Sequence, residues 1–576
     1  MKKILLLFLF LLPKSIFSIE PPIYFIMIDR FCNADKSNDY NNDITNPNAY
    51  QGGDLKGVIS KLKYLKSLGV KTIWLSPVMD NRDNDFFGSY GYHGYWIKDF
   101  KKVDEHFGTM EDLKELVNEA HIMGISIILD IVLNHTDWDC ELKAKHPHWF
   151  HNRGDIKNWN NREEVEEGNL TGLPDFNQDI IEVYDFCLDI ASFWYKETGC
   201  DGFRFDAVKH IPHRFWKNFL IDLRKLVSND FYFLAEVISG DPSCVSEYLE
   251  DGFDGIFDFP LYYRLLETFK NNESAKKVTT ILKGDSIYKN KNSLNPFLGN
   301  HDTERFYNNN ITLQKYKNAL SLIFVLRGIP VIYYGEEVPL SQDTKFGSRN
   351  IMEFRENPQI FYHLQRLSHI KNNSLALKYG EQEIILQEDN VIGILRYLDN
   401  EEVFAFTNTA DNIGTYTFSL PLNSFIIPQN KFKVLYGMGD ISIEEANKVR
   451  VGIYPNVTFI VQTFVNKKRK KKILSELIEV EIVIEECITN WGENVFLIGN
   501  TDILGNFDIN KAYGPLTCPN YPSWRCKIKL CLNEEIKIQP VVLDSTGKLL
   551  KQGKVSSFVL TDKNQIIKIK FSGQRY

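Results

Sequence analysis

Ionisable residues follow short apolar runs at four places in the sequence, and these residues could do chemistry together. The four segments are DIVLNH at 130–135, GFRFDAVKH at 202–210, FLAEV at 233–237 and FLGNHD at 297–302. They contribute three carboxylates and three nitrogen-bearing side chains: Asp206, Glu236, Asp302, His135, Arg204 and His301. Because removing a charge from water is costly, so many ionisable groups after buried runs indicate a functional site rather than structural ion pairs.

Two carboxylates on one face are what cleavage of a glycosidic bond requires. One ionised group attacks the anomeric carbon, and the other, kept protonated, donates to the leaving oxygen. Arg204 is two residues from Asp206, so on one strand both side chains point the same way. The guanidinium would lower the pKa of Asp206 and keep it an anion. Glu236 has no such cation beside it in the sequence.

The elements that must position these groups are eight apolar runs separated by amphipathic stretches. Stretches such as Leu55–Leu68 and Met110–Met123 end near Gly69 and Gly124, as helices commonly do. This alternation predicts a parallel (β/α)8 TIM barrel with its active site at the carboxyl ends of the strands. The predicted strands are Ile23–Asp29, Thr72–Leu75, Ser126–Leu133, Gly202–Asp206, Tyr232–Glu236, Gly255–Phe259, Leu294–Gly299 and Val331–Tyr334.

The spacing between the third and fourth strands is too long for one helix, so residues from about 135 to 180 are predicted to form an inserted subdomain. After about residue 376 the period changes to two, which predicts antiparallel strands. We therefore expect a barrel over 19–378, an all-β sandwich C-domain over 379–466, a basic linker KKRKKK at 467–472 and a second β-sandwich over 473–576. The predicted C-domain strands are Val391–Tyr397, Glu402–Asn408, Thr415–Leu420 and Val457–Phe464.

The N-terminus and the composition indicate where the protein works. Lys2 and Lys3 precede an apolar run that ends at Leu12, and Ser18 offers a cleavage point, so residues 1–18 are predicted to be a secretory signal peptide. The chain of 576 residues has a net charge of −8, which does not favour nucleic acid as a partner. We expect a secreted protein that is free of the membrane after signal cleavage and is a monomer.

The four motifs, in this order, resemble the alpha-amylase family, glycoside hydrolase family 13, over about residues 20–465. A fifth segment, LPDFN at 173–177, is similar to a motif near the end of the family's inserted domain B. The resemblance implies that Asp206 is the nucleophile, Glu236 the general acid/base, and Asp302 the carboxylate that stabilises the distorted sugar. It also implies sugar contacts from these side chains: Arg204, His135, His301, His93, Tyr95, Lys209 and His210. Tyr95 would be the stacking platform, and the last two would line the leaving-group side.

Members of the family commonly hold Ca²⁺ between the barrel and domain B. The matching positions are Asn134, Asp175 and the backbone carbonyl of His210, with Glu163 as a candidate for one more acidic ligand. Hard oxygen ligands of this kind suit Ca²⁺. A second cluster resembles the N-terminal Ca²⁺ site of the cyclodextrin glycosyltransferase branch, and a polar surface loop is the alternative interpretation. Its candidate ligands are Asn33, Asp35, Asn38, Asp39, Gly52 and Asp54.

The tail from Ile473 resembles a starch-binding domain, carbohydrate-binding module family 20. The segments that carry the resemblance are NWGENVFLIGN at 490–500, LGNF at 504–507 and YPSW at 521–524. Phe507 stands where such domains usually have Trp, so the other surface, with Trp491 and Tyr521, is expected to bind starch. Trp524 is expected in the core.

The resulting hypothesis is a retaining alpha-amylase that cleaves internal α-1,4-glucosidic bonds of starch, glycogen or maltooligosaccharides. Within the family, the alternatives are a cyclodextrin glycosyltransferase, a cyclomaltodextrinase and a maltogenic or α-glucosidase-type enzyme. Outside it, the alternative is a non-catalytic carbohydrate-binding barrel. Cyclodextrin glycosyltransferases usually insert an immunoglobulin-like domain before the starch-binding unit, and this chain has only a short segment there.

Overall fold

The computed structural model divides into two compact units, Met1–Lys468 and Arg469–Tyr576. It describes residues 19–308, 310–342, 345–355, 358–421, 423–424, 426, 430–445, 448–465, 477–490, 493–531, 535–544, 548–560 and 566–575. The predicted signal peptide, the basic linker and Trp491 lie outside these residues. None of the helices in the described part of the chain combines the length and apolar character needed to span a bilayer.

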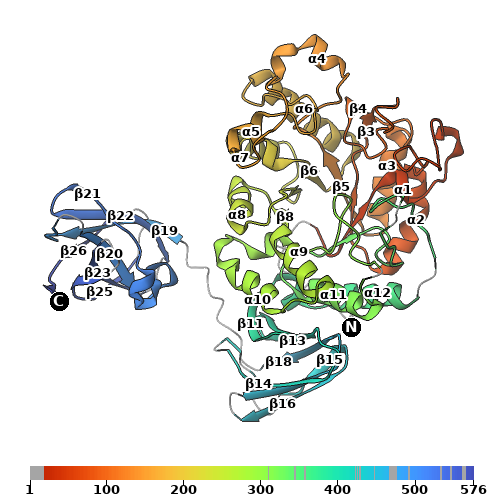
Figure 1. Ribbon diagram of the computed structural model, residues 1–576. Coiled ribbons are helices and arrows are strands. Elements are labelled where there is room, and N and C mark those ends of the chain that lie inside the picture. Colours follow the sequence, from red (N-terminus) through yellow and green to blue (C-terminus); the bar gives the residue numbers. More distant parts are fainter. Residues whose placement is uncertain are drawn as a thin grey trace, which may run out of the picture. The chain divides into compact units, whose positions relative to one another are not determined.

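Eight parallel strands form the centre of the first unit, in the order β10-β1-β2-β5-β6-β7-β8-β9 (Figure 1). A parallel bridge from Phe297, just beyond β9, to Val331 in β10 closes the sheet into the predicted barrel. The strands are β1 Ile23–Ile26, β2 Thr72–Leu75, β5 Ser126–Ile131, β6 Gly202–Phe205, β7 Tyr232–Ala235, β8 Gly255–Phe257, β9 Leu294–Asn295 and β10 Val331–Tyr333.

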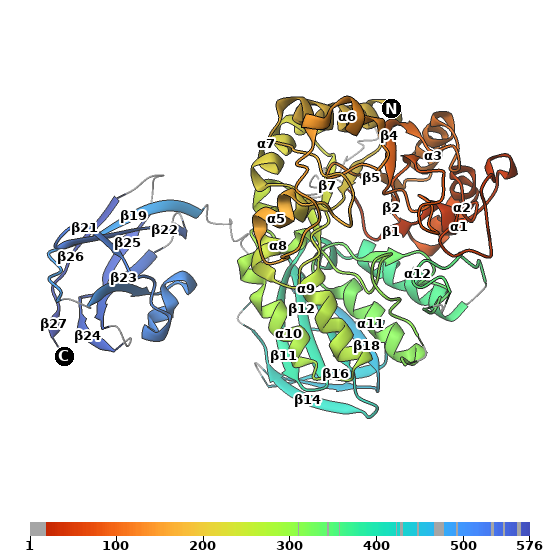
Figure 2. The same cartoon turned by 45° about the horizontal axis from the view of Figure 1, so that its top comes forward.

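Helices enclose the barrel strands (Figures 1 and 2). The two helices predicted from periodicity have the expected ends. Asp54 accepts a hydrogen bond from the Gly57 N–H at the start of α2, and Gly69 ends it at φ +91°. Thr109 and Asp112 form a capping box that starts α3. The helices longer than six residues are α2 Leu55–Leu68, α3 Met110–Ile122, α6 Ile181–Thr198, α7 His213–Arg224, α8 Pro242–Asp251, α9 Phe259–Leu265, α10 Lys276–Lys283, α11 Leu313–Val325 and α12 Pro358–Asn372.

Two insertions stand on the carboxyl-end side of the strands. One is an antiparallel hairpin, β3 Met79–Asn81 and β4 Ile97–Val103, which the sequence pattern did not predict because its residues are largely polar. The other follows β5 and is the predicted domain B. It contains α4 Glu141–Lys145 and α5 Arg162–Glu167, and it returns through Asp175, which bridges to His135.

The C-terminal part of the first unit has two antiparallel sheets, β11-β12-β13-β18-β15 and β14-β17-β16, which share an apolar core. The four strands predicted here exist, with four others besides. The strands are β11 Glu381–Glu388, β12 Val391–Leu398, β13 Glu401–Asn408, β14 Gly414–Ser419, β15 Lys433–Tyr436, β16 Gly439–Glu445, β17 Lys448–Ile453 and β18 Val457–Phe464. Short helix α13, Leu375–Tyr379, precedes them.

The second unit is all β, as predicted. One sheet has the order β21-β22-β19-β26 and the other β20-β23-β24-β27, with β25 beside β23, around a separate core. The strands are β19 Leu477–Glu485, β20 Asn494–Gly499, β21 Thr517–Asn520, β22 Ser523–Cys531, β23 Glu535–Leu543, β24 Leu549–Gln552, β25 Ser556–Val559, β26 Ile566–Lys570 and β27 Gln574–Arg575.

Candidate active site

The structure brings the predicted carboxylates to the carboxyl ends of the barrel strands. Asp206 directly follows β6, Glu236 directly follows β7, and Asp302 lies in the loop beyond β9. Parallel strands in register carry their last residues to one rim, and this is why three segments so distant in sequence meet. Asp206 and Glu236 are both buried, with 8% and 6% of their surface exposed.

One guanidinium, that of Arg204, connects the two carboxylates. Its Nη1 lies 2.8 Å from Asp206 Oδ1, and its Nη2 contacts Glu236 Oε1. The predicted neighbour of Asp206, Arg204, does pair with it, and Glu236 has the same cation as a second partner, which was not predicted. Arg204 Nη1 also lies 2.8 Å from Oδ1 of Asp130, which is opposite Arg204 in the β5–β6 register. The pairing of Asp130 with Arg204 was not predicted, although Asp130 belongs to the motif DIVLNH that the sequence analysis singled out.

Glu236 holds its proton despite Arg204. Burial raises the pKa of Glu236 to about 8, and the opposing effects of Arg204 and of the Ala207 N–H do not offset it. That N–H lies 3.1 Å from Glu236 Oε2. Ala207 adopts φ +49°, a left-handed conformation that is uncommon for a residue with a side chain, and such strain concentrates at functional sites. A protonated Glu236 is suited to donate a proton.

Asp302 remains an anion for the opposite reason. Burial alone would raise its pKa, but His301 and Arg349 outweigh burial and hold it below the usual value. Burial lowers the pKa of His301 to about 4, so at neutral pH Arg349 is the charged partner. Arg349 Nη2 lies 3.2 Å from Asp302 Oδ1, and its Nε donates to the His301 carbonyl. Sequence reasoning missed Arg349, because no local pattern connects a loop at 349 with a strand end at 302.

Aromatic and imidazole rings line the site as the resemblance implied. Tyr95 stacks on His301 with ring centroids 5.2 Å apart, and its hydroxyl donates to Asp130 Oδ2 at 3.0 Å. Its N–H donates to His93 Nδ1, and its carbonyl lies 3.1 Å from His135 Nε2. Burial lowers the pKa of both His93 and His135, so they face the site as neutral rings.

A short 3-10 turn, η3 Val208–His210, follows Asp206 and carries Lys209 and His210, which were predicted to line the leaving-group side. His210 Nδ1 lies 3.0 Å from the Val165 carbonyl of α5, and the Lys209 ammonium donates to the Ile238 carbonyl. Trp159 of domain B is 56% exposed, and its ring is edge-on to His210 at 5.9 Å. Trp159 was not among the predicted site residues, and it adds an exposed aromatic face beside Lys209 and His210.

Two of the predicted Ca²⁺ ligands between barrel and domain B, Asn134 and Asp175, lie on segments that are bridged to each other. Asn134 Oδ1 and Asp175 Oδ1 are shielded from solvent and receive no hydrogen bond within the described residues, while Asp175 Oδ2 lies 2.7 Å from His151. Burial raises the pKa of Asp175 to about 7. Buried oxygens without a donor are what a hard cation would satisfy, so these residues fit Ca²⁺.

The candidate acidic ligand Glu163 is corrected by the structure. Its side chain is 65% exposed and is paired with Arg153. Glu167, four residues later on α5, also pairs with Arg153, at 2.6 Å through Oε2, but its side chain is only 18% exposed and it acts electrostatically on Asp175. Residues i and i+4 of a helix lie one turn apart, so a spacing argument could have proposed Glu167 beside Glu163.

The second predicted Ca²⁺ cluster is assembled in part. Asn33 and Asn42 both donate to Asp39 Oδ1, at 2.7 and 2.8 Å. Gly52, at φ +89°, lies so close that an added Cβ would be 2.3 Å from Asn33 Nδ2. The Oδ1 atoms of Asn33, Asn38 and Asn42 are buried and receive no hydrogen bond in the described chain, which fits a cation there. Asn42 was not predicted.

Two other candidates of this cluster have different partners. Asp54 accepts hydrogen bonds from the backbone of Ala34, Asp35 and Gly57, and so caps α2. The Asp35 carboxylate accepts from Ser37 and pairs with the Lys56 ammonium at 2.6 Å. Their carboxylates are committed to these contacts, so the geometry does not support the prediction that they are ligands.

In the second unit, Tyr521 is 58% exposed, and its hydroxyl is held by the backbone of Thr489. Trp524 is buried, as expected, and donates to the Cys487 carbonyl. Phe507 is 39% exposed at φ +63°. The prediction for Trp491 lies outside the described residues.

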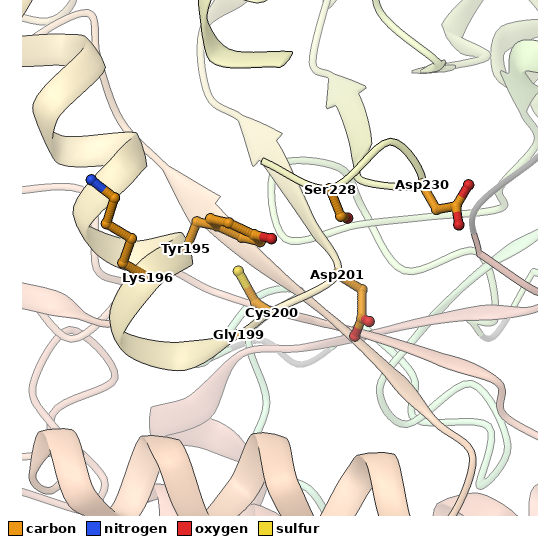
Figure 3. A pocket seen from close by; sticks show the side chains of 7 residues that line it. All are labelled: Tyr195, Lys196, Gly199, Cys200, Asp201, Ser228 and Asp230. Carbon is orange, nitrogen blue, oxygen red and sulfur yellow. The ribbon is translucent and has the colours of Figure 1, made fainter. Parts of the chain in front are cut away.

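A pocket of about 380 Å³ is found elsewhere on the barrel (Figure 3). Its lining includes Tyr195 at the end of α6, and Asp201 and Asp230, which precede β6 and β7. It therefore lies at the amino ends of the strands, whereas Asp206 and Glu236 lie at their carboxyl ends. This pocket is not part of the candidate active site.

A (β/α)8 barrel with paired carboxylates at its carboxyl rim defines a class, the barrel glycoside hydrolases. The model of the alpha-amylase catalytic domain matches residues 25–162 and 138–373, and the starch-binding-domain model matches 477–566. The chain belongs to the alpha-amylase family and carries a C-terminal domain of the starch-binding type.

Individual proteins of this family are similar to the chain over most of its length. The chain is 34% identical to the beta/alpha-amylase of Paenibacillus polymyxa over 418 residues, which are 69% of this chain but only 34% of that longer protein. It is 27% identical to the cyclomaltodextrin glucanotransferase of Klebsiella oxytoca over 88% of this chain and 87% of the relative. The solved structure of an Anoxybacillus alpha-amylase matches with a TM-score of 0.72 and 35% identity, covering 78% of this chain and 98% of that one.

Proposed function

We propose that the protein is a secreted, monomeric, retaining alpha-amylase that hydrolyses internal α-1,4-glucosidic bonds of starch, glycogen and maltooligosaccharides. The observation that carries the proposal is the contact of both Asp206 and Glu236 with one guanidinium. Adjacent nitrogens of one guanidinium can serve two carboxyl groups only if these are close together. Two neighbouring carboxyl groups on one rim supply the nucleophile and the proton donor that a double displacement requires.

In this mechanism Asp206, paired with Arg204, attacks the anomeric carbon and forms a covalent glycosyl-enzyme. Glu236 donates its proton to the leaving oxygen, then takes a proton from the water that hydrolyses the intermediate. Asp302, kept ionised beside Arg349, binds the distorted sugar. Tyr95 stacks on the sugar, which His93, His135 and His301 contact. Lys209 and His210 line the leaving-group side.

Asn134, Asp175, Glu167 and the His210 carbonyl would hold Ca²⁺, which would supply positive charge that joins domain B to the barrel beside Asp206. The chain itself already connects these parts. Phe176 N–H donates to the Asn134 carbonyl, and His210 contacts the Val165 carbonyl.

The alternative of a cyclodextrin glycosyltransferase is favoured by one observation, the near full-length match to the Klebsiella oxytoca relative. Against it, β18 ends at Phe464 and the starch-binding match begins at 477, so no further domain fits between them. Chromatography of the products from soluble starch separates the two. Linear maltooligosaccharides are expected, and cyclic products would overturn the amylase assignment.

The role of Asp206 is tested by Asp206→Asn, which removes the attacking anion and keeps the shape. Activity on maltoheptaose is expected to fall by several orders of magnitude with an unchanged melting temperature. Fresh product from the native enzyme is expected to be the α-anomer by proton NMR, because two displacements retain configuration. A variant with a tenth of the native kcat, or β-anomeric product, would contradict the assignment.

A further inference from the structure

Three carboxylates outside the active site converge beside the β3–β4 hairpin. They are Asp80 on β3, Asp83 in the loop that follows, and Glu105 just beyond β4. One oxygen from each lies within 4.8 Å of the others. These residues belong neither to the catalytic group nor to the two predicted calcium clusters.

The oxygens of this cluster are poorly satisfied by the protein. Asp83 Oδ1 and Glu105 Oε2 are shielded from solvent and receive no hydrogen bond from the described residues, and Asp80 Oδ1, also shielded, has only the Lys98 ammonium near it. The Asp80 side chain is only 4% exposed, so water does not solvate it instead. Buried carboxylate oxygens without donors are costly unless a cation faces them.

The cations that do face the cluster are incomplete partners. Lys98 Nζ lies 3.1 Å from Asp80 Oδ1 and contacts Asp83, and Lys102 Nζ lies 3.4 Å from Asp80 Oδ2 and contacts Glu105. Their side chains are 32% and 48% exposed, so both ammonium groups can turn into water.

The local charge remains negative even with these lysines in place. Asp104, fully buried next to Glu105, adds a fourth carboxylate. Its oxygens accept from the backbone of Asn81 and His106, and its Oδ1 lies 2.8 Å from His106 Nδ1. Four carboxylates exceed the two lysines and His106 even if that imidazole is protonated. His106 Nδ1 is also 3.9 Å from Asp83 Oδ1, too far for a hydrogen bond.

We propose that Asp80, Asp83 and Glu105 form a Ca²⁺ site, and that Lys98 and Lys102 turn out to solvent when the ion binds. A divalent ion approaches carboxylate oxygens to about 2.3–2.6 Å and brings two charges to one point. The all-oxygen, irregular ligand set, completed by water, suits Ca²⁺ better than Mg²⁺, which demands near-ideal octahedral geometry.

An ion at this site would stabilise the loop between β3 and β4. The loop between β3 and β4 carries His93 and Tyr95, and its two ends are joined by the Trp96 N–H, which donates to Asn81 Oδ1 at 2.8 Å. An ion bound by Asp80, Asp83 and Glu105 would join the two strands at the same base of the loop, because Asp80 is on β3 and Glu105 directly follows β4. Calcium at this position is therefore expected to stabilise the loop without touching the sugar.

The test counts calcium on the full chain. Metal-free protein is dialysed against radioactive Ca²⁺, and bound ions per chain are measured for the native protein, for Asp83→Asn/Glu105→Gln, and for the control Asp85→Asn in the same loop. The double variant is expected to bind one ion fewer than the native protein and the control, whatever number these bind. An equal count in all three would overturn the proposal.

A second variant covers the case in which the double variant fails to fold. Lys102→Met removes a competing ammonium and leaves the three carboxylates intact, so it is expected to bind Ca²⁺ at least as tightly as the native protein and to gain more melting temperature from it. If the cluster is only an ion-pair network, Lys102→Met loses stability and added Ca²⁺ does not restore it. That result would contradict the site.

Discussion

Arg204 is one cation shared by several buried carboxyl groups. Its guanidinium contacts Asp130, Asp206 and Glu236, so three carboxylates share one positive charge. Burial raises the pKa of Asp130 to about 7 and that of Glu236 to about 8, in spite of the shared cation. A single cation does not compensate three buried acids, so the group as a whole retains a proton near neutral pH.

At the scale of single residues, we predict the pH at which activity falls on the alkaline side, the alkaline limb of the pH profile. Glu236 donates a proton, its ordinary pKa is 4.5, and in the folded protein it rises to about 8. The competent form therefore persists through neutral pH and is lost as the pH rises through about 8. Above that value kcat/KM on maltoheptaose is expected to fall about tenfold per pH unit.

Melting temperatures over the same pH range are the control, since unfolding at high pH would imitate the limb. A limb near pH 5 in the folded protein would mean that Glu236 is not the proton donor, or that its carboxyl group is solvated. Loss of the limb in Glu236→Gln, on the residual activity, would support the assignment.

At the scale of elements, α5 is the piece of domain B that reaches the barrel. Its Val165 carbonyl contacts His210 in η3, and its last residue, Glu167, acts on Asp175. Asp175 is bridged to His135 at the end of β5. Segments that follow two different strands, domain B after β5 and η3 after β6, thus converge where calcium is expected, four residues from Asp206.

We predict that calcium stabilises this junction through Glu167 and not through Glu163. Both glutamates pair with Arg153, so Glu167→Gln and Glu163→Gln remove the same ion-pair partner. Only Glu167→Gln is expected to reduce the increase in melting temperature that added Ca²⁺ produces, because ligand binding to the folded state raises stability. Asn134→Ala should behave like Glu167→Gln.

The measurement is thermal unfolding of each variant after chelation and at increasing Ca²⁺. A native melting temperature that does not change on exhaustive chelation would contradict the junction site. Equal calcium responses of the two glutamate variants would contradict the assignment of Glu167 while leaving Asn134 and Asp175 in place.

At the scale of the whole molecule, the chain joins a catalytic unit to a second unit with its own core. Tyr521 is exposed on that unit, and its hydroxyl, bonded to the Thr489 backbone, holds the ring in place. A ring fixed in this way can remove a pyranose face from water, worth roughly 25 cal/mol per Å² of apolar surface. Phe507 offers a smaller ring on a strained backbone position.

We predict that Trp491→Ala and Tyr521→Ala each reduce adsorption of the full chain to granular starch by about tenfold or more, while Phe507→Ala changes it little. Hydrolysis of soluble maltoheptaose should be unaffected by all three, because the catalytic unit is intact. Circular dichroism checks that the variants fold. Unchanged adsorption of Trp491→Ala and Tyr521→Ala would remove the binding role from this surface.

The barrel and its rim were predictable from the sequence for a local reason. A buried parallel strand must be apolar throughout, so each strand is visible in its own residues, and an acid directly after it is placed at the rim by chain direction alone. All eight predicted barrel strands are present, each ending at or up to four residues before its predicted end. The β3–β4 hairpin was missed, since its polar residues are buried by ion pairs between its own two strands, which no apolar period reveals.

What the sequence determined by itself is which residues stand at strand ends, and hence Asp206, Glu236 and Asp302 with their motifs. Only the tertiary structure decided that Arg204 contacts three carboxylates, that Arg349 holds Asp302, and that Glu167 rather than Glu163 acts electrostatically on Asp175. Most of these interactions join residues that are far apart in the sequence and meet only at the rim of the barrel. Their distances depend on the path of the connecting loops and on burial, which no local period of the sequence encodes.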